Sequence, residues 1–594
     1  MAAIHKNDLA KLWKKLSTRA IRILLQTRLN ETQINLLLSL LIGLSAGFAA
    51  VGFQYLMRFS QILFNDYASR GLRYFSQYLI FFLPCLGGLW AGIVIYYGAK
   101  DAQGHGVSEV MAAVAIQGGR IPLRVGIVKA LASALTIGSG GSAGPEGPIV
   151  QIGSSVGSSI GQLFNMSEAR LKHLVGCGAA AGMAAMFNAP IAGVIFALEV
   201  ILGEFSTRVF TALVLSSVIA SVVSRAFFGN NPLLRVQSYG LITVRELVFY
   251  AALGLLIGLV SYVFYRALYF SEAVFEKIKW IRAPYMAAFG GLLVGGLGIL
   301  FPYAMGGSLE PISRALYGEW PILLMLTLVL AKMVMTSITL GSGGSGGIFS
   351  PLLFCGAMFG SAYGKMVGLF FPGITAASGA YAVVGMSACM AAAAQAPITA
   401  IILGFELTND YRIMLPLMLA CVLSTMLFNQ FSSESIYTLK LKRRGINVED
   451  GRDQDIMKKL TVDMAMQKTV DTVDETTPIS DFIDRVQKTG HAALPVLDLQ
   501  HHLTGMIAVH DVKMFRGSER QQDLLVRDLM TNENIEVVYP DEWFATALRR
   551  MGRRDVGRLP VVSRRNPKRL IGIISRGDII KYYNRELVLR HLDK

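Results

Sequence analysis

Apolar runs separated by short polar connections fill the chain from residue 33 to residue 437. Examples are INLLLSLLIGLSAGFAAVGF (34–53), YLIFFLPCLGGLWAGIVIYYG (78–98) and AALGLLIGLVSYVF (251–264), which approach or exceed the ~20 residues that cross a bilayer as a helix. After residue 437 the pattern changes to short alternating strands framed by helical stretches. The pattern predicts an all-α polytopic membrane domain followed by a soluble α/β domain.

Two glycine-rich segments interrupt the apolar pattern. GSGGSAGPEGP (138–148) and GSGGSGGIFSP (341–351) are identical at seven of eleven positions. A second match joins NAPIAGVIFALEV (188–200) to QAPITAIILGFEL (395–407). Internal repeats are typical of membrane transport proteins, whose sites form where discontinuous helices of both halves meet. We therefore expect two homologous halves with a site between them.

The soluble part contains a second repeat. HAALPVLDLQHHLTGMIAVHDV (491–512) and VGRLPVVSRRNPKRLIGIISRGDI (556–579) share Leu-Pro-Val, a polar turn, then Gly, an apolar pair and Asp. This pattern indicates a small β-α-β type module present twice. The predicted organisation is an amphipathic cytosolic segment (1–32), a membrane domain (33–437) with halves of about 33–230 and 240–437, a linker (438–459) and two modules (460–518 and 519–594).

Charge follows the same division. The span from Gln33 to Tyr437 carries 15 Asp and Glu residues, whereas the shorter span from Glu449 to Lys594 carries 23. Much of the net charge of +16 lies in the N-terminal segment and in KLKRRG (440–445), which flank apolar runs as the positive-inside rule expects. We expect a multi-pass protein of the plasma (inner) membrane, with both termini cytosolic and no nucleic-acid partner.

The glycine-rich segments suit the binding of an anion. Each offers backbone N–H groups just before an apolar helix, where the first amides lack internal partners and carry partial positive charge. Two such helix starts aimed at one point would bind an anion weakly enough for release. Glu146 lies in the first segment. Its carboxylate either competes with the anion or only caps helix amides, and the sequence leaves both interpretations open.

Three short motifs resemble those of the CLC family of chloride channels and chloride/proton exchangers, many of which carry tandem CBS domains. They are GPEGP (144–148), GIFSP (347–351) and Tyr437 within SESIYTLKLKRRG. The resemblance implies an inverted repeat in the membrane domain and a homodimer with one chloride pore per subunit. It also implies that Glu146 is the gate, and that the chloride contacts include Gly147, Ile348, Phe349 and Tyr437.

The chain departs from the family pattern at two informative positions. His105, in GHGVS (104–108), stands where a serine usually contacts the anion; a neutral imidazole can donate one N–H, unless the ring turns away and a backbone amide serves. Val200 follows Glu199, where exchangers usually carry a proton-transfer glutamate. Valine cannot relay a proton, so this position favours a channel.

CBS pairs in general bind adenine nucleotides through a G-x-x-[ST]-x-x-D segment. The second module keeps it as GIISRGD, with Ser575 and Asp578, whereas the first has GMIAVHD, with Ala508 replacing the hydroxyl. The resemblance therefore implies one adenine-nucleotide (ATP) site, unless the modules serve only dimerisation. No other cofactor is required.

We expect a gated chloride channel with a glutamate gate. The alternatives are an H+/Cl− exchange transporter and a non-conducting anion or nucleotide sensor; retention of all three pore motifs argues against the sensor. An enzyme is not expected, since the membrane part offers no nucleophile–base pair for catalysis. No metal site is expected either, because the five cysteines are single and lack CxxC spacing.

Overall fold

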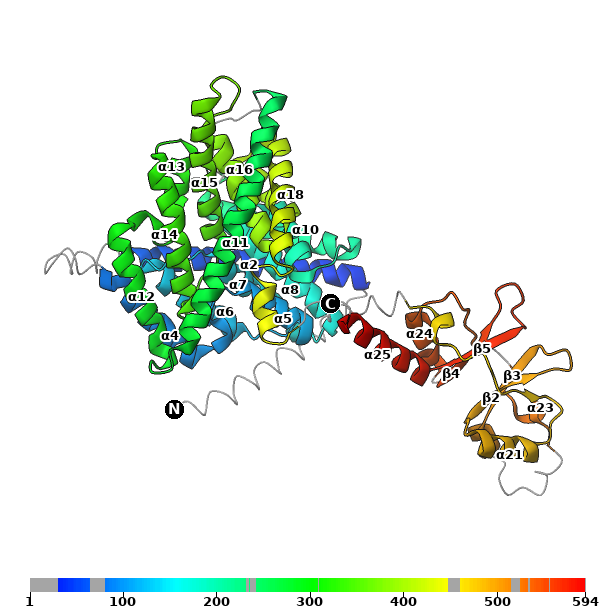
Figure 1. Cartoon of the computed structure of the whole chain (residues 1–594). Coiled ribbons are helices and arrows are strands. Elements are labelled where there is room, and N and C mark those ends of the chain that lie inside the picture. The colour runs from blue at the N-terminus through cyan, green and yellow to red at the C-terminus, as the bar shows by residue number, and fades with distance from the viewer. Residues whose placement is uncertain are drawn as a thin grey trace, which may run out of the picture. The chain divides into compact units, whose positions relative to one another are not determined.

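The computed structural model describes residues 30–64, 81–230, 234, 242–307, 309–446, 460–513, 524–532, 535–554 and 556–592. The chain divides into two compact units, Met1–Val448 and Glu449–Lys594 (Figure 1). Most of the predicted amphipathic segment, residues 1–29, lies outside the described residues, as do residues 447–459 of the predicted linker.

Within its described residues, the regular elements of the first unit are all helices, joined by short connections. Its elements are α2 (Glu31–Gln61), α4 (Leu83–Gly98), η3 (Lys100–Ala102), α5 (Val107–Ile116), α6 (Leu123–Gly138), α7 (Glu146–Leu163), α8 (Glu168–Phe187), α9 (Pro190–Phe196), η4 (Ala197–Leu202), α10 (Thr207–Phe228), η5 (Val244–Glu246), α11 (Leu247–Lys277), α12 (Ala283–Leu300), η6 (Pro302–Ala304), α13 (Leu309–Leu316), α14 (Ile322–Gly341), α15 (Phe349–Phe370), α16 (Ser378–Ala394), α17 (Pro397–Thr408), η7 (Tyr411–Ile413), α18 (Met414–Phe431) and α19 (Thr438–Arg443).

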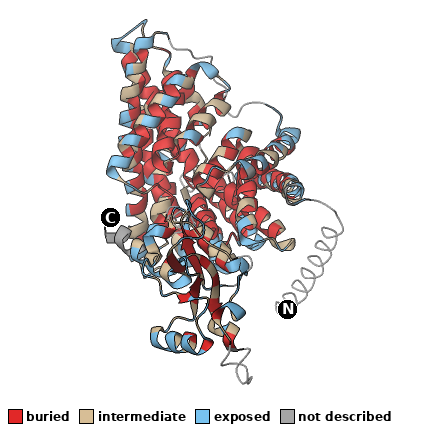
Figure 2. Cartoon of the chain, turned by 90° about the vertical axis from the view of Figure 1, so that its right-hand side faces the viewer, coloured by how far each residue is buried: buried red, intermediate tan, exposed pale blue. Residues whose placement is uncertain are grey.

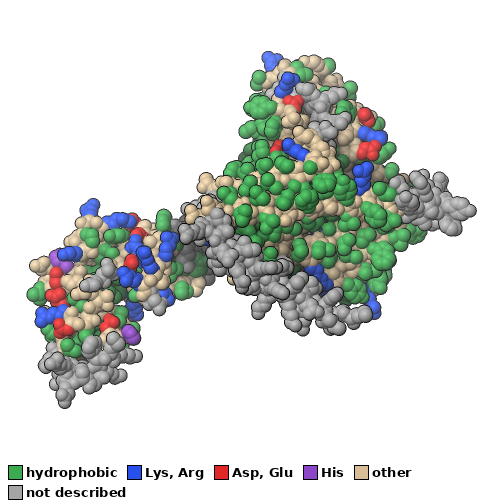
Figure 3. Space-filling view, turned by 180° about the vertical axis from the view of Figure 1, so that it is seen from behind, with side chains coloured by type: hydrophobic (Ala, Val, Ile, Leu, Met, Phe, Trp, Pro, Cys, Tyr) green, Lys and Arg blue, Asp and Glu red, His purple; other side chains and the backbone are tan. Residues whose placement is uncertain are grey.

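Within the described residues, seven helices are long and apolar enough to cross a membrane. They are Gln33–Phe64, Val209–Phe228, Val244–Lys277, Ala283–Leu300, Ile322–Gly341, Phe349–Phe370 and Tyr411–Phe431. Apolar side chains cover the middle of the surface drawn in Figure 3, with few charges among them. The predicted polytopic all-α membrane domain is therefore confirmed.

Helix boundaries recur at equivalent positions in the two halves. Helices α8 and α16 end at Asn188 and Gln395, whose φ angles of 55° and 52° are left-handed and stop the helix. Helices α9 and α17 then begin at Pro190 and Pro397, because proline suits the first helical position, where its missing N–H has no partner to lose.

Glycines let the central helices of each half approach closely. A Cβ on Gly153 of α7 would collide with the carbonyl of Gly178 in α8, and a Cβ on Gly356 of α15 with that of Gly385 in α16. Small residues at such crossings allow the backbone contact that helix association in membranes relies on. Buried residues accordingly fill the middle of the helical unit in Figure 2.

Two acids join the halves reciprocally. The Glu199 carboxylate of η4 accepts hydrogen bonds from the N–H groups of Ile398 and Thr399, at 3.2 and 2.8 Å, at the start of α17. The Glu406 carboxylate of α17 accepts from Ile191 and Ala192, at 3.0 and 2.7 Å, at the start of α9. Each half thus caps the start of a helix in the other half. The partial positive charge at a helix N-terminus stabilises the carboxylate that lies there.

Two lysines hold equivalent loops. Lys129 of α6 donates to the carbonyls of Ala102 and Gly104, at 3.1 and 2.5 Å. Lys332 of α14 donates to those of Ala304 and Gly306, at 3.0 and 2.9 Å. Both lysines are fully buried. Glu199, Glu406 and Lys129 therefore each have hydrogen-bond partners inside the helical unit.

The second unit contains the predicted α/β modules. Its elements are α20 (Val462–Ala465), β1 (Val473–Asp474), α21 (Ile479–Thr489), β2 (Ala493–Leu497), β3 (Leu503–Ala508), α22 (Val509–Lys513), α23 (Val526–Leu529), α24 (Phe544–Arg554), β4 (Arg558–Val562), β5 (Leu570–Ser575) and α25 (Arg576–Leu592). Strands β2 and β3 pair antiparallel, as do β4 and β5. In both pairs the Leu-Pro-Val strand lies against the strand with the Gly and apolar pair, so the sequence repeat is a structural repeat.

The reciprocal caps predict a loss of stability when one acid is removed. Glu406→Ala is expected to cost about 1.5–3 kcal/mol, because two amides at the start of α9 lose a charged acceptor. The measurement is the apparent melting temperature of the purified full chain in detergent. The control is Glu310→Ala, whose carboxylate is largely exposed beside Arg314; equal shifts in the two variants would contradict the capping role.

Candidate functional site

The two glycine-rich segments meet inside the membrane unit. Gly144 donates its N–H to the carbonyl of Gly347 at 2.8 Å, and Gly347 donates to that of Gly144 at 2.5 Å. Helix α7 begins two residues after Gly144, and α15 begins two residues after Gly347. This antiparallel bridge therefore brings two helix N-termini, each with partial positive charge, to one place.

A narrow cavity lies where these helix starts meet. In this conformation it is too narrow to admit a water molecule. Its lining includes every residue predicted for the gate and the chloride contacts: His105, Glu146, Gly147, Ile348, Phe349 and Tyr437. The cavity is therefore formed by segments far apart in the sequence. They are the starts of α5, α7 and α15, and Tyr437, the residue before α19.

Glu146 is the first residue of α7 and is 2% exposed. Its Oε1 accepts a hydrogen bond from the hydroxyl of Ser350, in the first turn of α15. Its Oε2 is buried without a hydrogen-bond partner among the described residues. The carboxylate therefore lies inside the cavity, held by one hydroxyl, with an oxygen left to accept a donor.

His105, like Glu146, is among the residues that line the cavity. The residue is 4% exposed, and its Nε2 lies 3.4 Å from the hydroxyl of Ser108. Its Nδ1 is buried with no hydrogen-bond partner in the described parts of the chain. The imidazole ring centre lies 5.8 Å from that of Tyr437. One ring nitrogen is therefore left without a partner among the described residues.

Tyr437 is held by contacts to its backbone neighbours. Ser108 donates its hydroxyl to the Tyr437 carbonyl at 2.6 Å, and the Tyr269 hydroxyl donates to the Ile436 carbonyl at 2.8 Å. One turn further on, Lys440 lies 3.3 Å from the Glu109 carboxylate. These contacts anchor the chain on both sides of Tyr437, and the ring is left to line the cavity.

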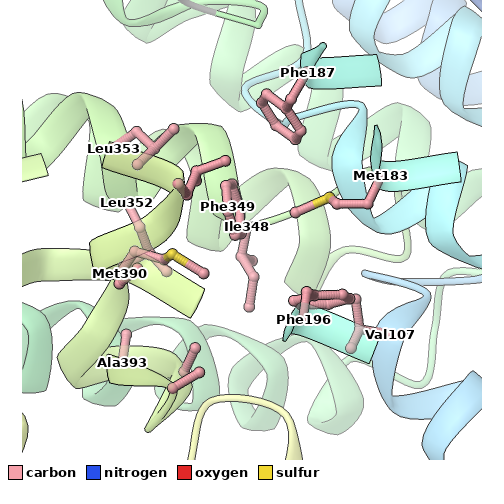
Figure 4. Packing of buried hydrophobic residues seen from close by; sticks show 14 of the residues in the cluster. Val107, Met183, Phe187, Phe196, Ile348, Phe349, Leu352, Leu353, Met390 and Ala393 are labelled. Atoms are coloured by element: carbon pink, nitrogen blue, oxygen red, sulfur yellow. The ribbon is translucent and has the colours of Figure 1, made fainter. Parts of the chain in front are cut away.

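Several lining residues were not predicted. Met183 and Phe196 come from α8 and α9, and Val107 and Val150 complete the apolar part of the lining. Figure 4 draws Met183, Phe196 and Val107 to the right of Ile348 and Phe349, and Leu352 and Met390 to their left. Apolar residues within long apolar runs carry no sequence signal of this role.

Ser350 could have been found from the repeat. It occupies the position that aligns with Gly147 when Pro148 is placed over Pro351. At this aligned position one half has a serine and the other a glycine, so the two halves differ by one hydroxyl group. That Ser350 hydroxyl donates the hydrogen bond to Glu146.

Val200 lies away from this lining. It belongs to η4, one turn of π-helix over Ala197–Leu202, and is buried. The neighbouring Glu199 is committed to the start of α17 through Thr399, whose hydroxyl also donates to it at 2.6 Å. Neither residue contributes an acid to the cavity.

The predicted nucleotide residues form a tight turn in the second unit. Asp578 Oδ2 accepts from the N–H and the hydroxyl of Ser575, at 2.9 and 2.6 Å. Gln467 donates to Asp578 Oδ1 at 3.0 Å. In the first module Asp511 accepts from the N–H of Ala508 at 2.8 Å, without a hydroxyl. Among the described residues no group of three His, Cys, Asp or Glu side chains could hold a metal ion.

Comparisons with known proteins agree with this arrangement. The family model described as "Voltage gated chloride channel" matches residues 87–429, and the CBS domain model matches residues 461–516 and 526–585. The chain is 33% identical over 379 residues to "Putative chloride channel protein ClcB-like" of Ralstonia nicotianae, covering 63% of this chain and 87% of that protein. It is 33% identical over 378 residues to "H(+)/Cl(-) exchange transporter ClcA" of Salmonella agona, covering 61% and 78%.

Solved structures extend the comparison. A slow cyanobacterial Cl−/H+ antiporter matches with a TM-score of 0.63 and 25% identity, over 70% of this chain and 98% of that one. A eukaryotic CLC transporter matches with a TM-score of 0.58 and 19% identity, over 92% of this chain and 97% of that one. The second match shows the fold alone, and it extends over both units.

The close approach of the glycine segments predicts that Gly147→Ala disables the site. A Cβ there would collide with the carbonyl of His105 and crowd Gly347, and such overpacking costs ~1–3 kcal/mol. Chloride efflux from liposomes is expected to fall at least tenfold per folded protein. The control is Gly296→Ala in α12, where a Cβ meets nothing within 4 Å; equal efflux in both variants would contradict the geometry.

Proposed function

Because the chain belongs to the voltage gated chloride channel family, known as CLC, and is a multi-pass membrane protein with CBS domains, we propose that it exchanges chloride for protons. The observation that carries the proposal is the position of Glu146, a buried carboxylate within the cavity lined by both helix starts. As an anion, Glu146 competes with chloride for the same donors. As an acid, it carries a proton.

In the proposed cycle chloride and the Glu146 carboxylate alternate in the cavity. The backbone amides of Gly147, Ile348 and Phe349 and the hydroxyl of Tyr437 hold the chloride. His105 donates to it from Nδ1 in the tautomer that carries its one N–H there. In that tautomer Nε2 makes no hydrogen bond to Ser108, because the Ser108 proton goes to the Tyr437 carbonyl. These donors carry partial charges rather than a fixed cation, so binding offsets dehydration of the ion and still permits release. Protonated Glu146 leaves the cavity, and the incoming chloride takes its place.

A gated chloride channel is the second candidate, and Val200 favours it. An exchanger built on this chain has to bring protons to Glu146 without an acid at that position. The exchange transporter of Salmonella agona and the cyanobacterial antiporter support exchange, whereas the relative in Ralstonia nicotianae is named a putative channel. The comparisons therefore support the exchange alternative better than the channel interpretation.

We further propose a homodimer with one pathway in each subunit, residence in the plasma (inner) membrane, and cytosolic termini. Cytosolic termini are supported by the basic residues of α19, which directly follow the last apolar run. Homodimers are implied by the family resemblance.

Proton movement against its gradient distinguishes exchange from conduction. In liposomes with an imposed chloride gradient and the membrane potential clamped, the wild-type chain is expected to drive protons uphill, measured with an internal pH dye. Glu146→Gln keeps chloride flux but loses proton movement, because the amide cannot carry the proton. Robust chloride flux without uphill protons in the wild type would establish the channel instead, and no flux at all would favour a sensor.

For the CBS pair we propose one adenine-nucleotide site at Ser575 and Asp578. In the first module Ala508 stands at the position of Ser575 and has no hydroxyl, whereas Asp511 matches Asp578. ATP binding to the full chain, measured by isothermal titration calorimetry, is expected to be lost in Asp578→Ala and retained in Asp511→Ala. Equal ATP binding by the two variants would contradict the assignment.

A further inference from the structure

Helix α11 presents a mixed stripe on the outside of the membrane unit. Leu259, Val263, Arg266 and Phe270 follow one another at spacings of four, three and four residues, so they share one face of the helix. Leu259, Val263 and Phe270 are 48%, 46% and 72% exposed, and Arg266 is exposed as well. A cation therefore interrupts an otherwise apolar, outward-facing stripe.

Arg266 marks where α11 leaves the hydrocarbon region. The residues from Leu247 to Tyr265 contain no charged side chain, and Arg266 is the first charge after them. These nineteen residues span about 28 Å as a helix, close to the ~30 Å of a bilayer core. The guanidinium therefore lies at the level of the lipid headgroups, where long basic side chains are favourable.

An apolar groove opens one turn inside the membrane from Arg266. It has a volume of about 270 Å³ and lies between α11, α14 and α15. Val260 and Val263 line it from α11, Leu330 and Met333 from α14, and Phe359 from α15, and every lining residue is apolar. A groove of this kind in a membrane-facing wall suits a hydrocarbon chain.

The charge of Arg266 is available to a ligand. In the described part of the chain no hydrogen bond or ion pair to its guanidinium is formed. One turn further along α11, the Arg443 guanidinium lies 4.8 Å from the Tyr269 ring centre, so a second cation lies near this end of the helix. The planar guanidinium matches phosphate with two parallel N–H donors.

We propose that Arg266 and this groove form a binding site for an anionic phospholipid. The lipid phosphate binds the guanidinium, and one acyl chain lies along the groove between α11 and α14. A second copy of the chain is a poorer occupant, because burying Arg266 in an apolar interface would leave a charge without a partner. A free phosphate ion would not use the groove.

Competition between two lipids tests the proposal. The full chain in detergent is titrated with phosphatidylglycerol and phosphatidylcholine of identical acyl chains, and bound lipid is counted by native mass spectrometry. The wild type is expected to prefer phosphatidylglycerol. Arg266→Gln is expected to lower that preference about fivefold, the effect of one basic residue at an anionic surface, and Val263→Trp, which fills the groove, to weaken binding of both lipids.

Two variants near the opposite end of α11 serve as controls. Arg245→Gln removes a cation just before the opposite end of α11, and Val248→Trp enlarges an exposed side chain far from the groove; both are expected to bind lipid as the wild type does. Unchanged lipid preference in Arg266→Gln would overturn the headgroup contact. Unchanged lipid binding in Val263→Trp would overturn the groove, and a dimer population lost only in Val263→Trp would assign the face to a second copy.

Discussion

Backbone groups inside a membrane domain must find partners within the protein, and the structure around the cavity depends on how two interrupted segments meet this requirement. Gly144 and Gly347 exchange both of their backbone hydrogen bonds, so each segment satisfies the other where neither forms helix. This crossing fixes where α7 and α15 begin. Irregular backbone is tolerated at membrane depth only when it is buried in protein or lines a cavity, and here it does both.

The same crossing explains the chemistry of the site. The bridge brings the starts of α7 and α15 together, and residues of both helix starts line the cavity. The buried lysines nearby are directed to carbonyl oxygens: Lys129 holds the loop that ends at Gly104, next to His105. Their donors are thus occupied by the scaffold, and the cavity itself offers amides, a hydroxyl and an imidazole. We expect a site of this composition to bind an anion weakly enough for release, as the proposed transport requires.

Much of this arrangement could be predicted from the sequence, since it is encoded by repeats. The identity between the two glycine segments indicated that they would meet, and the Glu199 and Glu406 match indicated equivalent roles. The apolar lining from Met183 and Phe196 could not be predicted, because such residues are common throughout the unit. The reciprocity of the caps could not be predicted either. A sequence alignment shows that Glu199 and Glu406 occupy equivalent positions, but not that each carboxylate caps a helix in the other half.

That reciprocity bears on how such a chain could arise. A polypeptide holding one half alone would have a bare helix start near Pro190 and a carboxylate at Glu199 without its amides. Two copies of that polypeptide, related by a two-fold axis, would satisfy both needs in one step. Gene duplication and fusion would then make permanent an association that the ancestral chains already needed in order to be stable.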